Sequence, residues 1–116
     1  FDPLVPPTLA EGWRPTVARF DTNRWTLVVT TPAEQFISFE QARASVREML
    51  LSSTVEATRG KQAKLGGHTW RVGKDESGNR AYFREDGELV FMVISNAKTE
   101  VVDAYIASFV PFSSLP

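Results

Sequence analysis

The sequence predicts an α+β fold: a mainly antiparallel sheet of six or seven strands with two helices packed on one face. Three observations lead to this prediction. Short segments alternate between apolar and polar residues, which is typical of strands. Turn-forming clusters of Asp, Asn and Gly separate these segments, as in hairpins. Two longer segments carry apolar residues at helical spacing, and two such stripes suit one face of an antiparallel sheet.

The amino-terminal part begins with residues 1–12, a proline-rich lead-in that we interpret either as a linker or as a strap across the domain. Three strands are expected next, over Trp13–Asp21, Arg24–Thr31 and Gln35–Gln41. In the first of them, Trp13, Val17 and Phe20 are the expected buried positions, and Pro15 favours a sheet edge. A helix over Ala42–Ser53 follows, because its apolar residues recur at helical spacing.

The polar segment Val55–Gly67 has an optional strand near residues 55–64, and a second group of strands and one helix follows it. The strands are expected at His68–Lys74, Arg80–Glu85 and Leu89–Ser95. The last is apolar on both faces, which predicts a central strand covered on both sides. A helix capped by Asn96 or Thr99 is expected to reach about Val110, before Pro111. The order is βββα(β)βββα, in one domain over residues 13–112 with a tail at 113–116.

Composition limits the classes of function. The chain has 116 residues, one domain's worth, and 13 basic against 14 acidic residues, which argues against nucleic acid as a partner. No Lys/Arg run is present that would bind anionic lipid head groups. The absence of cysteine excludes disulfides and thiolate chemistry. The chain begins at Phe1 rather than Met, so we expect a mature or truncated form whose signal or anchor has been removed.

The polar residues do not form a catalytic motif. His68 is the single histidine and has no partner at a set spacing, so we expect it to be structural or exposed. The acidic pairs Asp75/Glu76 and Glu85/Asp86 fall in predicted turns, where such residues face water. The run from Asp75 to Asn79 matches a calcium loop only in part, because its flanks are strands. We therefore expect no catalytic residue, no metal and no cofactor.

Aromatic residues are the main candidates for binding. We assign Phe20, Phe39, Phe91, Tyr105 and Phe109 to the core. Tryptophan combines a large apolar area with a polar N–H group, which suits pocket rims and interfaces. Two arginines on the first helix, together with Arg59, Lys61 and Lys64, form a mildly basic surface that would attract an acidic partner. The candidate ligand- or partner-binding residues are Trp13, Trp25, Trp70, Phe36, Arg43 and Arg47.

Several segments occur in an order that is similar to a known family. They are Leu9-Ala10-Glu11-Gly12-Trp13-Arg14, Trp25 to Pro32, Phe36 to Gln41, Gly67-His68-Thr69-Trp70, the Gly78 turn and Val90 to Ser95. In these features the chain resembles an actinobacterial family catalogued as domain of unknown function 4245. Members of that family carry one amino-terminal membrane-spanning helix, so the resemblance implies an extracytoplasmic domain anchored to the cytoplasmic membrane. The family has no established activity, and the resemblance implies a location rather than a reaction.

Together, these observations predict a non-catalytic, membrane-tethered domain that binds a protein partner or an apolar ligand in the cell envelope. Two alternatives stay open: a lipid or lipoprotein carrier with a cavity between sheet and helices, and a hydrolase with an unrecognised site. A cavity above roughly 300 Å³ lined by Trp and Phe would favour the carrier. A flat exposed apolar patch would favour a protein interface, and a buried carboxylate with a raised pKa in a cleft would favour the enzyme.

Overall fold

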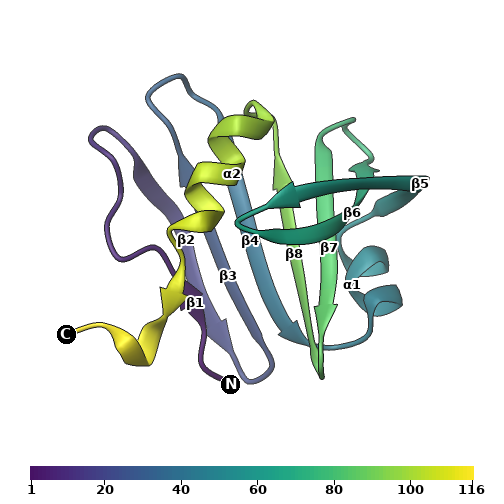
Figure 1. Cartoon of the computed structure of the whole chain (residues 1–116), viewed down its shortest axis with the longest axis horizontal. Helices are drawn as coiled ribbons and strands as arrows, with labels where there is room; N and C mark the ends of the chain where they lie inside the picture. Colours follow the sequence, from purple (N-terminus) through teal and green to yellow (C-terminus); the bar gives the residue numbers. More distant parts are fainter.

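The computed structural model describes residues 1–116 and shows one strongly twisted antiparallel sheet (Figure 1). Its seven strands lie in the order β2-β3-β4-β8-β7-β6-β5. Their bounds are β2 (Arg14–Asp21), β3 (Arg24–Thr30), β4 (Phe36–Arg43), β5 (Val55–Leu65), β6 (His68–Asp75), β7 (Arg80–Asp86) and β8 (Leu89–Ser95). The helices are α1 (Val46–Ser52) and α2 (Thr99–Ala107). The predicted α+β class, the antiparallel sheet and the order of the elements are confirmed.

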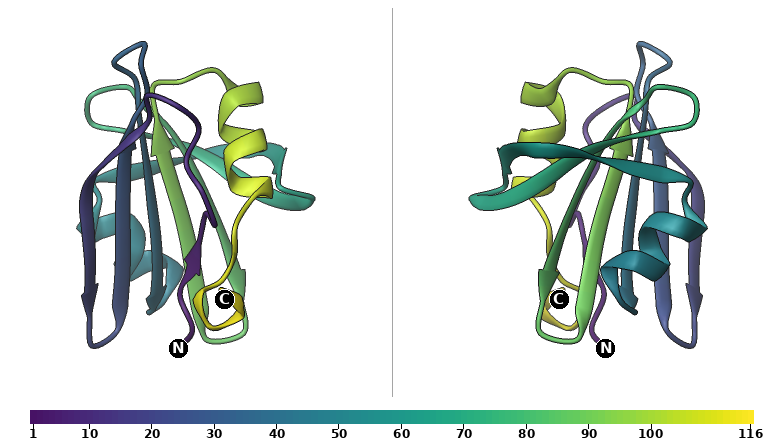
Figure 2. Two further views of the ribbon diagram at one scale, coloured as in Figure 1. Left: turned by 90° about the vertical axis from the view of Figure 1, so that its left-hand side faces the viewer. Right: turned by 90° about the vertical axis from the view of Figure 1, so that its right-hand side faces the viewer.

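The two helices lie on opposite faces of the sheet, so the prediction that both pack on one face is wrong (Figure 2). The reason lies in β8, whose alternate residues enter two separate cores. Phe91 and Val93 pack in the core that α2 covers, whereas Val90 and Met92 pack in the core that α1 covers with Met49. A strand that is apolar on both faces needs cover on both, and the predicted central position of β8 is confirmed.

Strand β2 lies at the sheet edge, as Pro15 predicted, but its side chains are exposed. Val17 is 41% exposed and Phe20 is 47% exposed, so their predicted burial is wrong. No helix covers this edge, and a bulge between Pro15 and Val17 shifts the register with β3. Phe20 is covered in part by Phe1, whose ring centroid lies 5.3 Å from its own.

Both helices are shorter than predicted. Helix α1 begins at Val46 because a capping box fixes its start. Ser45 Oγ accepts a hydrogen bond from Glu48 N, and Glu48 Oε1 accepts one from Ser45 N. Ala42 and Arg43, which were expected in the helix, extend β4 instead. Helix α2 begins at Thr99 without a side-chain cap. The predicted cap Asn96 accepts a hydrogen bond from Phe36 N at 2.9 Å instead.

The proline-rich lead-in lies along the domain as a strap. Its short strand β1 (Leu4–Val5) pairs with β9 (Val110–Pro111), which precedes a 3₁₀ turn at Phe112–Ser114. Trp25 Nε1 donates to the Leu4 carbonyl at 3.0 Å, so the strap is fastened to β3 as well. The first and last segments of the chain therefore lie side by side (Figure 1). Neither helix has both the length and the apolar character needed to cross a bilayer.

Candidate functional site

The β5–β6 hairpin builds one wall of a large concavity on the face of the sheet that α2 covers. The pairing of β5 with β6 is interrupted between Ala57 and Gln62, so that residues 58–61 leave the ladder as a wide bulge. Beside the bulge, Gly73 allows the two strands to approach closely, since a Cβ atom there would lie 2.4 Å from the Glu56 carbonyl oxygen. The polar segment in which a strand was optional is an 11-residue strand, and its bulge contributes Thr58 and Lys61 to the lining of the concavity.

The concavity is a cleft of about 860 Å³, which falls within the range of roughly 300–1,000 Å³ common for small-molecule sites. The bulge of β5, the β6–β7 turn and the loop from β8 to α2 enclose it. Only 4 of its 14 lining residues are hydrophobic, and neither Trp nor Phe is among them. The cleft is therefore suited to a polar ligand.

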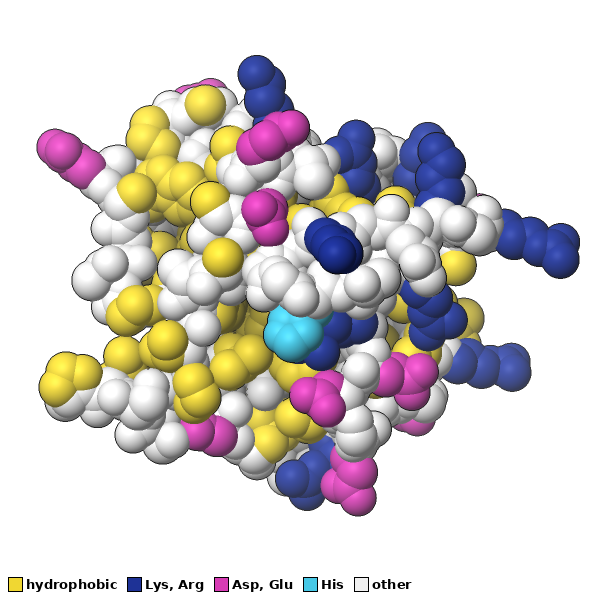
Figure 3. All heavy atoms as spheres, viewed as in Figure 1, with side chains coloured by type: hydrophobic (Ala, Val, Ile, Leu, Met, Phe, Trp, Pro, Cys, Tyr) yellow, Lys and Arg dark blue, Asp and Glu magenta, His cyan; other side chains and the backbone are white.

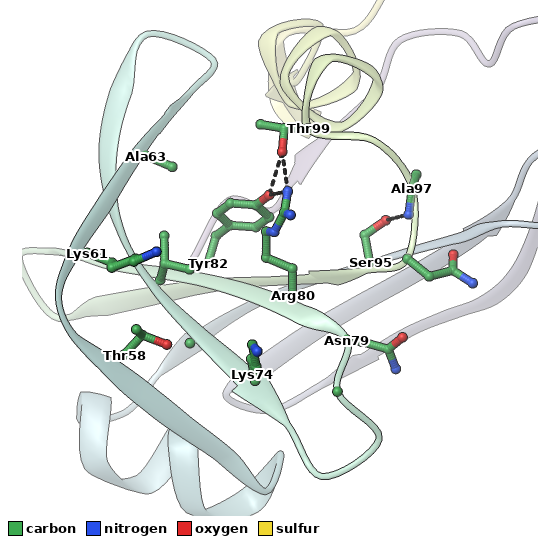
Figure 4. A pocket seen from close by; sticks show the side chains of 14 residues that line it. Thr58, Lys61, Ala63, Lys74, Asn79, Arg80, Tyr82, Ser95, Ala97 and Thr99 are labelled. Carbon is green, nitrogen blue, oxygen red and sulfur yellow. Dashed lines mark hydrogen bonds between the residues drawn. The ribbon is translucent and has the colours of Figure 1, made fainter.

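The charged groups that line the cleft are all basic. Lys61 comes from the bulge, Lys74 from β6 and Arg80 from β7, and the three surround the same space (Figure 4). No Asp or Glu side chain lines the cleft. A cavity walled by one sign of charge concentrates counter-ions of the opposite sign. The cleft therefore favours an anionic ligand.

Arg80 is held in place by two hydroxyl groups. Its Nη1 atom donates to Tyr82 Oη at 3.3 Å and also to Thr99 Oγ1, while the two hydroxyl oxygens lie 3.2 Å apart (Figure 4). The hydrogen bond with Tyr82 raises the pKa of the Arg80 guanidinium. Because Tyr82 is buried, its hydroxyl is a fixed anchor, and the remaining N–H groups of Arg80 are free to donate to a ligand.

The carboxylate of Asp75 lies in the turn next to the cleft and is used by that turn. Its Oδ1 atom accepts hydrogen bonds from Ser77 N at 3.0 Å and from Asn79 N at 2.8 Å, and its Oδ2 atom accepts from Asn79 Nδ2 at 3.0 Å. Slight burial raises the pKa of Asp75, but the hydrogen bonds together lower it by more. The pKa of Asp75 is therefore below its usual value. The carboxylate thus shapes the hairpin that presents Lys74 and Asn79.

The candidate residues from the sequence are not brought together. Trp13 packs on Tyr105, with ring centroids 5.4 Å apart, and Trp25 binds the strap. Trp70 is buried and donates from Nε1 to the Leu65 carbonyl at 3.0 Å. The other three lie elsewhere. Phe36 is the first residue of β4 and Arg43 the last, with Arg43 Nε 3.9 Å from Glu88 Oε2, and Arg47 is exposed on α1.

The sequence places Lys61 in a mildly basic surface but gives no sign of Lys74, Arg80 or Tyr82 as site residues. These residues come from β6 and β7, and Lys61 comes from a bulge that no alternation pattern predicts. A search for runs of basic residues does not find a cluster whose members lie on three strands. The one local signal was the Asp75–Asn79 turn, whose hairpin places Lys74 and Arg80 in register with each other.

Two further ionisable residues lie outside the cleft. Glu40 is on the opposite face of the sheet, where burial raises its pKa and Arg24 Nη1, at 3.1 Å from Glu40 Oε2, lowers it in part. His68 is exposed at the start of β6. Neither lines the cleft, and no group of three or more His, Asp or Glu side chains is placed to hold a metal ion.

No curated protein and no solved structure shows significant similarity to the chain. A family model does match it, over residues 1–109, which takes in the strap, the whole sheet and both helices. The chain therefore belongs to the family described as "Protein of unknown function (DUF4245)".

Proposed function

We propose that this domain is a non-catalytic binding module whose ligand carries a phosphate group on a polar, hydroxyl-rich body. One observation carries the proposal: the cleft of about 860 Å³ is lined by Lys61, Lys74 and Arg80 and by no acidic residue. Arginine and lysine are the usual phosphate-binding side chains. The volume of about 860 Å³ exceeds what a lone phosphate needs, and the amide and hydroxyl groups of the wall suit a polar body.

The other polar groups at the cleft support the binding of an anion there. Thr58 and Asn79 add a hydroxyl and an amide, and Thr99 begins α2 at the rim. No side chain caps this helix end, and its N-terminal partial positive charge is offset in part by Glu100 in the first turn. The lining also lacks histidine and carboxylate groups, the side chains that most often transfer protons in catalysis. This supports a binding role over a hydrolytic one.

The proposed location rests on the family resemblance described above. We propose that the domain is extracytoplasmic and tethered to the cytoplasmic membrane, as expected for an actinobacterial member of this family. In that setting a phosphate group comes either from a lipid head group or from a soluble phosphorylated saccharide of the envelope. The chemistry of recognition is the same for both sources, and the experiment below separates them.

The apolar-carrier alternative has less support. The hollow lined by aromatic side chains is only about 100 Å³, well below the roughly 300 Å³ that would favour a lipid cavity. Phe39, Trp70 and Phe91 mainly fill the core beneath it. An anionic polar ligand therefore fits the shape and charge of the domain better than an acyl chain does.

The test is an NMR titration of the ¹⁵N-labelled domain in low salt. Inorganic phosphate is added in one arm, and vesicles of phosphatidylglycerol or of phosphatidylcholine in two others. We expect phosphate to shift the amide signals of Thr58, Lys74, Asn79 and Thr99 and to shift them less as salt is raised. Loss of these signals with phosphatidylglycerol but not phosphatidylcholine would identify a lipid source, whereas shifts with free phosphate alone would identify a soluble one.

Two lysines on the same hairpin provide a matched pair of variants. Lys74→Gln removes a charge from the cleft, whereas Lys64→Gln removes one from β5 outside it. We expect the first variant to lose most of the phosphate-induced shifts and the second to keep them. Shifts that are absent in the wild type, or that decrease equally in both variants, would overturn the proposal.

A further inference from the structure

Arg84 is a partly buried cation without an acidic partner. It lies on β7 over two aromatic rings of the core, with its guanidinium carbon 4.4 Å from the centroid of Phe91 and 5.1 Å from that of Trp70. Its Nε atom is shielded from water and has no hydrogen-bond partner. None of the ion pairs of the domain includes Arg84. The acidic group that acts on it, Asp86, is exposed and outside ion-pair distance.

The contrast with Arg71 shows that this is unusual within the same domain. Arg71 also stacks on an aromatic ring, at 4.8 Å from the centroid of Phe83, but its Nη2 atom lies 3.7 Å from Glu85 Oε1. Burial lowers the pKa of Arg84 below its ordinary value, because the charged form loses hydration. Buried polar and charged groups normally have partners, so the shielded and unpartnered Nε atom of Arg84 calls for an explanation, and a bound ligand would supply one.

A small apolar hollow opens beside Arg84. It holds about 100 Å³ and is lined by Phe39, Phe91, Ile106 and Phe109, with the exposed His68 and Ala107 at its rim. Figure 3 shows the single histidine at the centre of this face, with hydrophobic side chains below it and basic side chains beside it. For scale, an engineered apolar cavity of roughly 150 Å³ accommodates benzene. The hollow therefore fits a group of a few carbon atoms.

We propose that this hollow binds a carboxylate carried on a short branched apolar group, which pairs with Arg84. The planar guanidinium matches a carboxylate in geometry. A single negative charge suits a site whose other lining residues are mostly hydrophobic, since a doubly charged phosphate would lose more hydration on entering it. The hollow shares no lining residue with the cleft, so this site stands independently of the phosphate proposal.

The test uses isobutyrate as the probe and isobutyramide, of nearly the same shape but uncharged, as its control. We expect isobutyrate to shift the amide signals of Trp70, Arg84 and Ile106, and isobutyramide to bind at least about tenfold more weakly. N-acetylvaline is a third probe, because its carboxylate imitates the end of a peptide. Binding of either carboxylate with rejection of isobutyramide supports the site; binding of no carboxylate, or equal binding of the amide, overturns it.

Variants separate a ligand-binding role from a structural one. Arg84→Met keeps an apolar stem over the rings and removes the charge, so we expect at least about tenfold weaker isobutyrate binding without loss of thermal stability. Arg71→Met is the matched control and should leave isobutyrate binding unchanged. Ala107→Phe adds a ring at the exposed rim and should block the hollow. If Arg84→Met unfolds the domain, Ala107→Phe still tests the proposal. Isobutyrate binding that persists in Ala107→Phe would contradict a site in this hollow.

Discussion

The side-chain Oε1 atom of Gln41 accepts a hydrogen bond of 2.8 Å from the backbone nitrogen of Leu4, 37 residues earlier in the chain. The same amide donates from Nε2 to the Asp2 carbonyl at 3.3 Å. Gln41 is only 2% exposed, so its polar groups depend on the strap for their hydrogen bonds. The proline-rich lead-in is thereby part of the folded domain.

Replacing Gln41 with Leu should loosen the strap. The substitution leaves the Leu4 N–H without its acceptor, and an unsatisfied buried donor costs about 1–3 kcal/mol. We expect a lower free energy of unfolding in urea and faster hydrogen exchange at the Leu4 amide. The control Gln62→Leu changes an exposed glutamine on β5. An unchanged exchange rate at Leu4 in Gln41→Leu would show that the strap is held by other contacts.

The two tyrosines of the domain should respond in opposite ways to removal of their hydroxyls. Tyr105 Oη is buried without a partner, and burial raises the pKa of this phenol. Tyr82 Oη, in contrast, bonds Arg80 and Thr99. Tyr105→Phe keeps the ring contacts and should raise the free energy of unfolding by about 1 kcal/mol, whereas Tyr82→Phe should lower it by about 1–2 kcal/mol. Equilibrium denaturation of both variants tests this, and a destabilised Tyr105→Phe would contradict the assignment of its hydroxyl as unsatisfied.

Acid should weaken the β6–β7 hairpin through Asp75. Its pKa is lower in the folded state than in the unfolded chain, so the unfolded chain binds more protons between the two values. The stability that Asp75 contributes is therefore complete above the unfolded pKa and is lost as the pH falls through the folded one. Asp75→Asn should lower the melting temperature at about pH 7 and have a smaller effect at about pH 2.

The neighbouring residue supplies the control for this pH dependence. Glu76→Gln removes an exposed carboxylate from the same turn, and this carboxylate accepts no hydrogen bond. We expect its melting temperature to follow the wild type at both pH values. An effect of Asp75→Asn that is the same size at both pH values would show that the charge of Asp75 does not matter to the turn.

Much of the architecture could be predicted from local patterns. The predicted bounds of β8, Leu89–Ser95, match the observed ones, because an unbroken run of apolar residues forms both faces of this strand. The placement of the helices could not be predicted in this way, since a stripe such as that around Met49 shows which side is buried but not which face of the sheet it meets. The exposure of Phe20 likewise depends on its strand lying uncovered at the edge.

The candidate site was much less predictable than the fold. The bulge that carries Lys61 arises where Gly73 allows β5 to approach β6. The residues around Lys61 and Gly73 in the sequence contain no pattern that predicts this bulge. Arg80 and Thr99 are 19 residues apart and meet only because the last helix begins above β7. The lack of a partner for Arg84 results from three-dimensional packing, so it cannot be predicted from the spacing of residues in the sequence.

The most direct test of the phosphate-binding cleft is calorimetric titration with inorganic pyrophosphate of two double variants that lose the same charge. Lys61→Gln with Lys74→Gln removes two of the three positive charges from the cleft, whereas Arg59→Gln with Lys64→Gln removes two from β5 outside it. We predict that the first pair weakens binding by about tenfold or more and the second by less than about twofold. Equal weakening by both pairs, or by neither, would contradict the account.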